Sequence, residues 1–159
     1  MGKAVALDHL QVAMPRAKEA AARAFYGHVL GLAEIPKPEQ LAARGGVWFQ
    51  CGPQQLHLGV EDVLRPAKKA HPAFAVEDLD ALARDLEAGD YRAVVDSVQL
   101  EGSRRNFTED PFGIRVELIQ HGSEALLGHE PLPTCSTLSP NMKHSEWRIC
   151  GHCARRCSS

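Results

Sequence analysis

The stretch FTEDPFGIRVELIQ, residues 107–120, places the segments FTE and IRVELIQ on either side of Asp-Pro-Phe-Gly (110–113). Proline and glycine at these positions favour a tight turn, so we predict a β-hairpin. The second strand of this hairpin carries Glu117 inside the apolar run IRVELI. Burying an ionised carboxylate is costly unless the carboxylate is paired or binds a metal ion. Glu117 therefore needs a partner, which is either a metal ion or one of two nearby arginines, Arg105 and Arg115.

The segment before this hairpin predicts a strand, a helix and a second strand. Residues 70–76, AHPAFAV, are strand-like. Asp78 can cap a helix that carries an apolar stripe and that Gly89 ends. Residues 91–98, YRAVVDSV, predict the next strand. The second half of the chain thus has the order strand, helix, strand, hairpin.

The first half follows the same plan. Residues 7–13, LDHLQVA, alternate like a short strand, and residues 16–30 are rich in helix formers. Gly31 then ends the helix as a left-handed cap. After a loop rich in proline and glycine, VWFQC (47–51) and QLHLGV (55–60) predict a hairpin.

This internal repeat places polar residues at equivalent positions of the two halves. His9 opens the first copy and His71 the second, while His57 and Glu117 lie in the two closing strands. We expect each of the four to lie within a strand, which holds ligands rigidly. Two or three imidazoles with one carboxylate suit one divalent ion of Zn, Ni, Co, Mn or Fe rather than Ca²⁺. The repeat therefore predicts a metal site made of His9, His57, His71 and Glu117.

The predicted fold class is α+β, with two βαβββ modules that form a curved mixed sheet around a concave metal or ligand site. We place the domain at 1–121, with modules at about 5–62 and 68–121. From residue 122 onward the helix and strand periods vanish, and proline, serine and threonine dominate. We expect 122–159 to be a weakly ordered C-terminal tail.

Composition excludes several classes of function. The 159 residues suit one domain, and 44% hydrophobic with 24% charged residues is ordinary for a globular protein. The formal net charge is −2 and the basic residues are scattered among acids, which argues against nucleic-acid partners and anionic membrane surfaces. The sequence has no apolar run long enough for a transmembrane helix, and MGKAVALDHL lacks a signal-peptide core. We expect a cytoplasmic location.

The five cysteines do not form a disulfide framework distributed through the body. Cys51 lies in an apolar run, whereas Cys135, Cys150, Cys153 and Cys157 lie in the tail. The stretch CGHCARRC can be imagined as a small zinc site, but a second, well-spaced ligand pair is not evident. We therefore expect the tail to be a dispensable extension.

Five stretches of the sequence resemble one protein family: LDHLQVAM, FYGHVLGL, QLHLGVE, HPAFAVEDLDAL and FTEDPFGIRVELIQ. Together they span roughly residues 6–121 and resemble the vicinal oxygen chelate superfamily, also called glyoxalase/bleomycin resistance/dioxygenase. The resemblance implies paired βαβββ modules, a metal at their concave face and, usually, a homodimer. The family's metal positions fall on His9, His57, His71 and Glu117.

Departures from the family's patterns narrow the chemistry that the resemblance implies. Glyoxalase I carries a glutamate where His57 stands, so Glu117 is the remaining carboxylate base. Extradiol dioxygenases carry a tyrosine where Phe107 stands, and a histidine a few residues earlier that SVQLEGSRR lacks. Fosfomycin thiol transferases carry a threonine where Gln11 stands. Ring cleavage and fosfomycin modification are thus the less favoured reactions.

The function that remains is a metal-dependent glyoxalase-type lyase or isomerase acting on a small oxygenated substrate by bidentate chelation. Glu117, or a metal-bound water, would be the base, and the metal would stabilise an enediolate. Trp48, Gln50, Arg105 and Phe107 are the candidate substrate-binding residues. Core packing of Trp48 and a solvated charge for Arg105 are the alternatives. The rival functions are a non-catalytic small-molecule or drug-binding protein of the bleomycin-resistance type, and a domain whose histidines merely pack.

Overall fold

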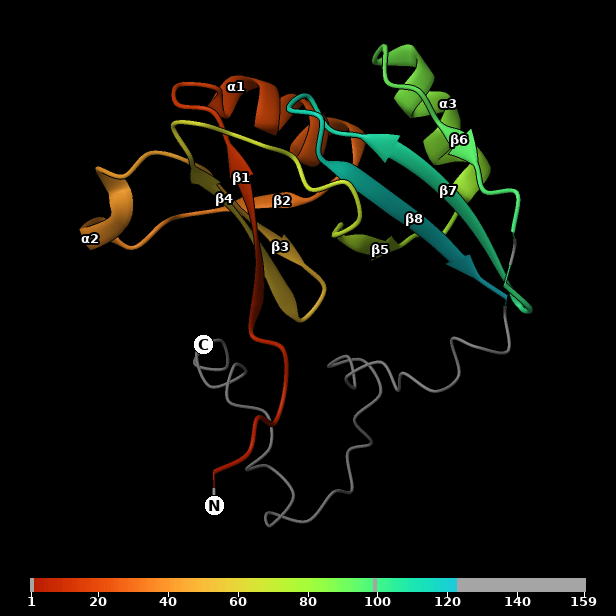
Figure 1. Ribbon diagram of the computed structural model, residues 1–159, viewed down its shortest axis with the longest axis horizontal. Helices are drawn as coiled ribbons and strands as arrows, with labels where there is room; N and C mark the ends of the chain where they lie inside the picture. The colour runs from red at the N-terminus through yellow and green to blue at the C-terminus, as the bar shows by residue number, and fades with distance from the viewer. Residues whose placement is uncertain (1, 99, 123–159) are drawn as a thin grey trace, which may run out of the picture. The chain divides into compact units, whose positions relative to one another are not determined.

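The computed structural model describes residues 2–98 and 100–122 (Figure 1). Apart from Gly122, the predicted tail lies outside these described residues, and so do its four cysteines. Within the described residues no helix is long and apolar enough to cross a membrane.

The first module contains a four-stranded sheet of order β1-β4-β3-β2, in which β1 runs parallel to β4 and the other neighbours are antiparallel. Its elements are β1 (His9–Met14), α1 (Glu19–Ala22), η1 (Arg23–Val29), β2 (Ala33–Ile35), α2 (Glu39–Ala42), β3 (Val47–Cys51) and β4 (Gln54–Val60).

The second module repeats this arrangement with the order β5-β8-β7-β6, and β5 runs parallel to β8. Its elements are β5 (Ala73–Ala75), α3 (Leu79–Ala88), β6 (Val94–Val95), β7 (Ser103–Glu109) and β8 (Arg115–His121). The equivalent strand orders confirm the α+β prediction of two βαβββ modules.

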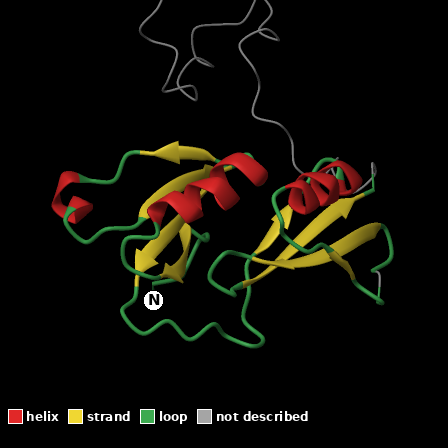
Figure 2. Ribbon diagram, turned by 90° about the horizontal axis from the view of Figure 1, so that it is seen from above, coloured by secondary structure: helices red, strands yellow, loops and turns green. Residues whose placement is uncertain are grey.

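In each module a helix packs on one face of the sheet (Figure 2). Along β3, Val47 and Phe49 are buried beneath η1, whereas the alternate residues Trp48 and Gln50 point to the opposite face. The same alternation on β8 buries Val116 and Leu118 on the side that α3 covers. The helix-free face of each sheet is therefore the face on which the polar candidates lie.

The first helix differs from the prediction of a regular helix over 16–30. It begins at Glu19, and from Arg23 to Val29 it is a wider π-helix. The Leu30 amide donates to the Phe25 carbonyl at 2.9 Å, one residue beyond the α-helical spacing. Alanine-rich composition predicts a helix but not its winding. Gly31 has φ 70°, which confirms the predicted left-handed end.

Three other segments correct the sequence-based expectations. The predicted strand 70–76 is shortened to β5, so His71 precedes the strand instead of lying within it. Pro72 has no amide hydrogen and cannot extend the ladder as a donor. The predicted strand 91–98 is reduced to the two residues of β6. In the first module, β2 and α2 lie in a segment that we expected to be a loop.

A buried hydrogen bond ties the two halves of the repeat together. Tyr26 on η1 donates its hydroxyl hydrogen to Asp110 Oδ2 at 2.9 Å, and both residues are buried. Asp110 Oδ1 accepts from the amides of Phe112 and Ile114 at 2.9 and 2.8 Å. The aspartate thus closes the 110–113 turn and anchors the first helix at the same time. This contact gives a structural reason for two of the stretches quoted above, FYGHVLGL and FTEDPFGIRVELIQ.

The Asp110 carboxyl gives the stability of the fold a dependence on pH. Burial raises its pKa above the ordinary value of 3.8, against the opposing effect of its hydrogen bonds. A raised acid pKa favours folding below the unfolded-state pKa, and this contribution is lost as pH rises through the folded-state pKa. In wild type the free energy of unfolding should therefore fall as pH rises through the folded-state pKa of Asp110. We expect this fall to be absent in Asp110→Asn. Urea denaturation between pH 4 and 7 would show it, with exposed Asp85→Asn as the control; an unchanged pH slope in Asp110→Asn would contradict the assignment.

Candidate functional site

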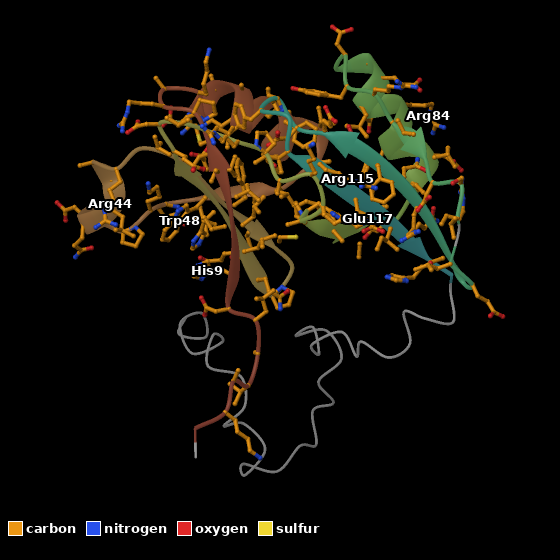
Figure 3. All side chains as sticks on the ribbon, viewed as in Figure 1. His9, Arg44, Trp48, Arg84, Arg115 and Glu117 are labelled. Atoms are coloured by element: carbon orange, nitrogen blue, oxygen red, sulfur yellow. The ribbon has the colours of Figure 1, made fainter. Side chains whose placement is uncertain are left out.

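Three aromatic rings stack on the helix-free face of the first sheet. The Trp48 and His57 ring centroids lie 3.7 Å apart with planes 7° apart, because these residues are cross-strand partners on β3 and β4. The His9 ring stacks on the other side of His57 at 4.3 Å and 22°. Figure 3 shows His9 and Trp48 on this module. The predicted histidine pair of the first module therefore lies together.

His57 is held in the middle of this stack. Its side chain is buried, and Nε2 lies 2.9 Å from Gln55 Oε1. Its pKa is lowered, mainly because burial disfavours the imidazolium and also because of the neighbouring His9. A neutral imidazole is the form that binds metals. However, stacked rings direct their in-plane lone pairs side by side, so His9 and His57 in this arrangement do not point at one common ion.

His9 and His71 share a hydrogen-bonding feature of metal-binding histidines. Nδ1 of His9 lies 2.7 Å from Asp8 Oδ1, and Nδ1 of His71 lies 2.6 Å from the carbonyl oxygen of Lys69. Both contacts are to acceptors, which places a hydrogen on each Nδ1. In the neutral His9 ring, Nε2 then keeps its lone pair. An acceptor behind the ligating ring is the usual second contact of such histidines.

Glu117 lies on the helix-free face of the second sheet with only 8% of its surface exposed. Its Oε2 lies 2.9 Å from Nε2 of His71, and its amide donates to the carbonyl of Pro72 at 3.0 Å. The backbone contact keeps His71 beside Glu117 although His71 is outside the strand. The contact between His71 Nε2 and Glu117 Oε2 is a hydrogen bond, which requires a hydrogen on Nε2. A bound cation would take the place of that hydrogen and use both atoms as ligands.

Arg105 supplies the partner that a buried carboxylate requires. Its Nη1 donates to Glu117 Oε1 at 3.0 Å, while Nη2 pairs with Asp96 and donates to the carbonyl of Val98 at 2.8 Å. Of the partners considered for Glu117, the structure therefore shows Arg105. Oε1 is used by this ion pair, and Oε2 faces the histidine.

The donor set fits a divalent metal, but the part of the chain that the structure describes does not gather it at one point. Among residues 2–98 and 100–122 no group of three or more His, Cys, Asp and Glu side chains is placed to hold an ion. The four predicted ligands form two pairs instead, His9 with His57 on the first module and His71 with Glu117 on the second. Imidazole nitrogens and one carboxylate suit Zn²⁺ and its neighbours. The ligand set stays a prediction.

The four candidate substrate-binding residues lie beside these pairs. Trp48 flanks the first pair, and the Phe107 ring meets the His71 ring edge-on at 5.7 Å. Gln50 uses its amide hydrogens within the hairpin, donating to the carbonyls of Gly52 and Gln54 at 2.8 and 2.9 Å. Arg105 is committed to two carboxylates. Binding of substrate by these residues stays a prediction.

Sequence reasoning missed the residues that orient the candidates. Asp8 could have been found, because it directly precedes His9. Gln55 lies two residues from His57 on the same strand face, which is also a readable signal. Asp96 gives no such signal, since it reaches Arg105 from the irregular segment after β6.

Two repeated four-stranded sheets, each with a helix on one face and candidate ligands on the other, define a paired βαβββ protein. Residues 6–118 match the Glyoxalase/Bleomycin resistance protein/Dioxygenase superfamily, and the chain belongs to this family. The resemblance inferred from the motifs is thereby confirmed. Among curated proteins no sequence matches the chain.

Solved structures support the same fold. A glyoxalase family protein from Bacillus anthracis is 43% identical with a TM-score of 0.71, covering 76% of this chain and 98% of its own. Lactoylglutathione lyase from Agrobacterium tumefaciens is 24% identical with a TM-score of 0.55, covering 75% and 96%. The fosfomycin resistance protein FosX from Listeria monocytogenes is 16% identical with a TM-score of 0.63, covering 79% and 98%. The last two likenesses concern the fold alone.

Proposed function

We propose that the protein is a metal-dependent lyase or isomerase of glyoxalase type that acts on a small oxygenated substrate. The observation that carries the proposal is the nearly buried Glu117 carboxylate facing Nε2 of His71 at 2.9 Å. His9, His71 and Glu117 would hold the metal. His57 would become a fourth contact by turning out of its stack with Trp48 and His9. The described lactoylglutathione lyase neighbour has this type of fold, and the family contains enzymes of this class.

We further propose that two copies of the chain complete the site. Each copy carries one histidine pair and one His-Glu pair on different modules, and a two-fold dimer can bring the first pair of one copy to the second pair of the other. Val5, Leu7 and Leu10 leave large apolar side chains exposed around His9. In a dimer, the surface of the partner subunit would cover these exposed apolar side chains beside the His9–His57 pair.

The chain's own residues would divide the chemical work as follows. A bound divalent metal would supply Lewis-acid polarisation of two neighbouring substrate oxygens. Glu117 would take a proton from a carbon beside a carbonyl through Oε2 and return it to the adjacent carbon. Arg105 holds Oε1 at 3.0 Å and so fixes which carboxylate oxygen faces the substrate. Trp48 would shield the site from water as an aromatic wall.

Mixing two inactive variants tests this assignment. His9→Ala and Glu117→Gln should each lose turnover of a 2-oxoaldehyde–thiol adduct after metal reconstitution. In a mixed dimer one of the two shared sites contains neither substitution. Random exchange of subunits should therefore restore about a quarter of wild-type turnover.

The matched control is wild type mixed with the double variant, whose mixed dimers contain no intact shared site. In an equal mixture, subunit exchange should lower the turnover of this control from about one half to about one quarter of the wild-type value. If native mass spectrometry detects the mixed dimers and the two single variants together remain inactive, the shared site is wrong. If wild type itself turns over no such adduct, the glyoxalase-type reaction is wrong.

A further inference from the structure

A pocket of about 810 Å³ lies beside the His71–Glu117 pair, which is called the second half-site below. Its walls come from the segment before β5, the segment between α3 and β6, and the β7–β8 hairpin. Phe107 belongs both to this pocket and to the half-site, because its ring contacts His71 and it is the cross-strand partner of Glu117. Phe107 therefore links the pocket to the proposed base, which does not itself line it.

Arg115 lines the pocket from the same strand face as Glu117, two residues away on β8 (Figure 3). Its guanidinium carbon lies 3.8 Å from the centroid of the Phe107 ring. Stacking against an aromatic face leaves the edge of a guanidinium, with its N–H donors, free to bind a planar anion. Arg115 is half-buried, and its position is thus set by the ring beneath it.

The surrounding charges leave Arg115 available. Within the described residues it has no carboxylate within ion-pair distance, although Glu109 is its cross-strand partner. Asp110, the buried acid of the pocket wall, is directed to Tyr26 and to backbone amides instead. Arg105, the other arginine near Glu117, already pairs with two carboxylates.

We infer that this pocket receives an oxyanion group of the substrate, a carboxylate or a phosphate, and that Arg115 binds it. The inference rests on the proposed function, since it names the substrate class of the same site. Lys68 and Arg92 add two exposed cations to the pocket wall, and Asp90 and Glu109 add two exposed carboxylates. The preference for an anion therefore rests on the stacked guanidinium of Arg115. Bound there, the anion would lie beyond Phe107 and the reacting carbons would lie on the Glu117 side.

A kinetic experiment compares methylglyoxal adducts of three thiols that differ in charge: 2-mercaptoethanol, 3-mercaptopropionate and 2-mercaptoethyl phosphate. Wild type should prefer an anionic adduct over the neutral one in kcat/KM by at least about tenfold. Arg115→Gln should lose this preference, mainly through a higher KM, and Arg115→Lys should keep part of it. Arg84→Gln is the matched control, because it removes the same charge from the exposed face of α3, outside the pocket.

A binding experiment separates this inference from the reaction. Propionate or inorganic phosphate is titrated into the metal-free full chain while the backbone amide signals of residues 113–115 are followed by NMR. Saturable shifts in wild type and Arg84→Gln, and their loss in Arg115→Gln, would support the pocket even if no adduct turns over; the anion that shifts them identifies the group. Turnover without charge preference, or equal shifts in Arg115→Gln, would overturn it and leave the proposed function standing.

Discussion

Glu117→Gln is expected to lower kcat of the metal-reconstituted protein by about 10³-fold, because a glutamine neither accepts a proton nor binds a divalent cation as a carboxylate does. The substitution preserves the shape of the side chain. Arg105 keeps its ion pair with Asp96, so the second sheet should stay folded. Turnover of the 2-oxoaldehyde–thiol adduct and bound metal are measured on the same samples.

Glu87→Gln provides the control for this prediction, since it removes the same charge from an exposed position on α3. It should leave both turnover and metal content as in wild type. If Glu117→Gln retains a tenth of the activity together with its metal, Glu117 is not the base. If it loses activity because it no longer melts cooperatively, the side chain's role is to balance Arg105.

Asp110→Ala is expected to lower the free energy of unfolding by about 3 kcal/mol or more, because it leaves three donors without their acceptor in a buried place. These donors are the Tyr26 hydroxyl and the amides of Phe112 and Ile114. Tyr26→Phe removes one of the three and should cost about 1–2 kcal/mol. Urea denaturation measures both values.

The comparison of these two variants shows whether the aspartate acts mainly within its turn or between the modules. Asp85→Ala on the exposed side of α3 should change stability by no more than about 0.5 kcal/mol. A cost of Asp110→Ala below about 1 kcal/mol would mean that water replaces the three contacts. The buried network would then not be what anchors the first helix.

The repeat could be predicted from the sequence because the signals for its helices, strands and turns are local. The Asp-Pro-Phe-Gly turn, the Asp78 cap and Gly31 each depend on backbone preferences of a few neighbouring residues. Asp78 does accept from the amides of Asp80 and Ala81, as the cap predicted. The π-helical winding after Arg23 was not predictable, because it depends on burying Phe25 and Tyr26 against distant residues.

The candidate site was predictable only in part. Glu117 was identified by the energetic cost of a carboxylate in an apolar strand, and Arg105 was among the partners that this cost demanded. The stack of Trp48, His57 and His9 follows from strand register, which the sequence does not specify between β1 and β4. The separation of the ligands into two pairs depends on the packing of the modules against each other. No local sequence pattern predicts that packing.

The metal content of the purified protein tests the central claim most directly. Untagged protein is reconstituted with a divalent metal, dialysed and measured by inductively coupled plasma mass spectrometry beside His9→Ala and Glu117→Gln. The account predicts about one ion per chain in wild type and a large loss in both variants. Wild type that carries no more metal than the two variants would contradict it.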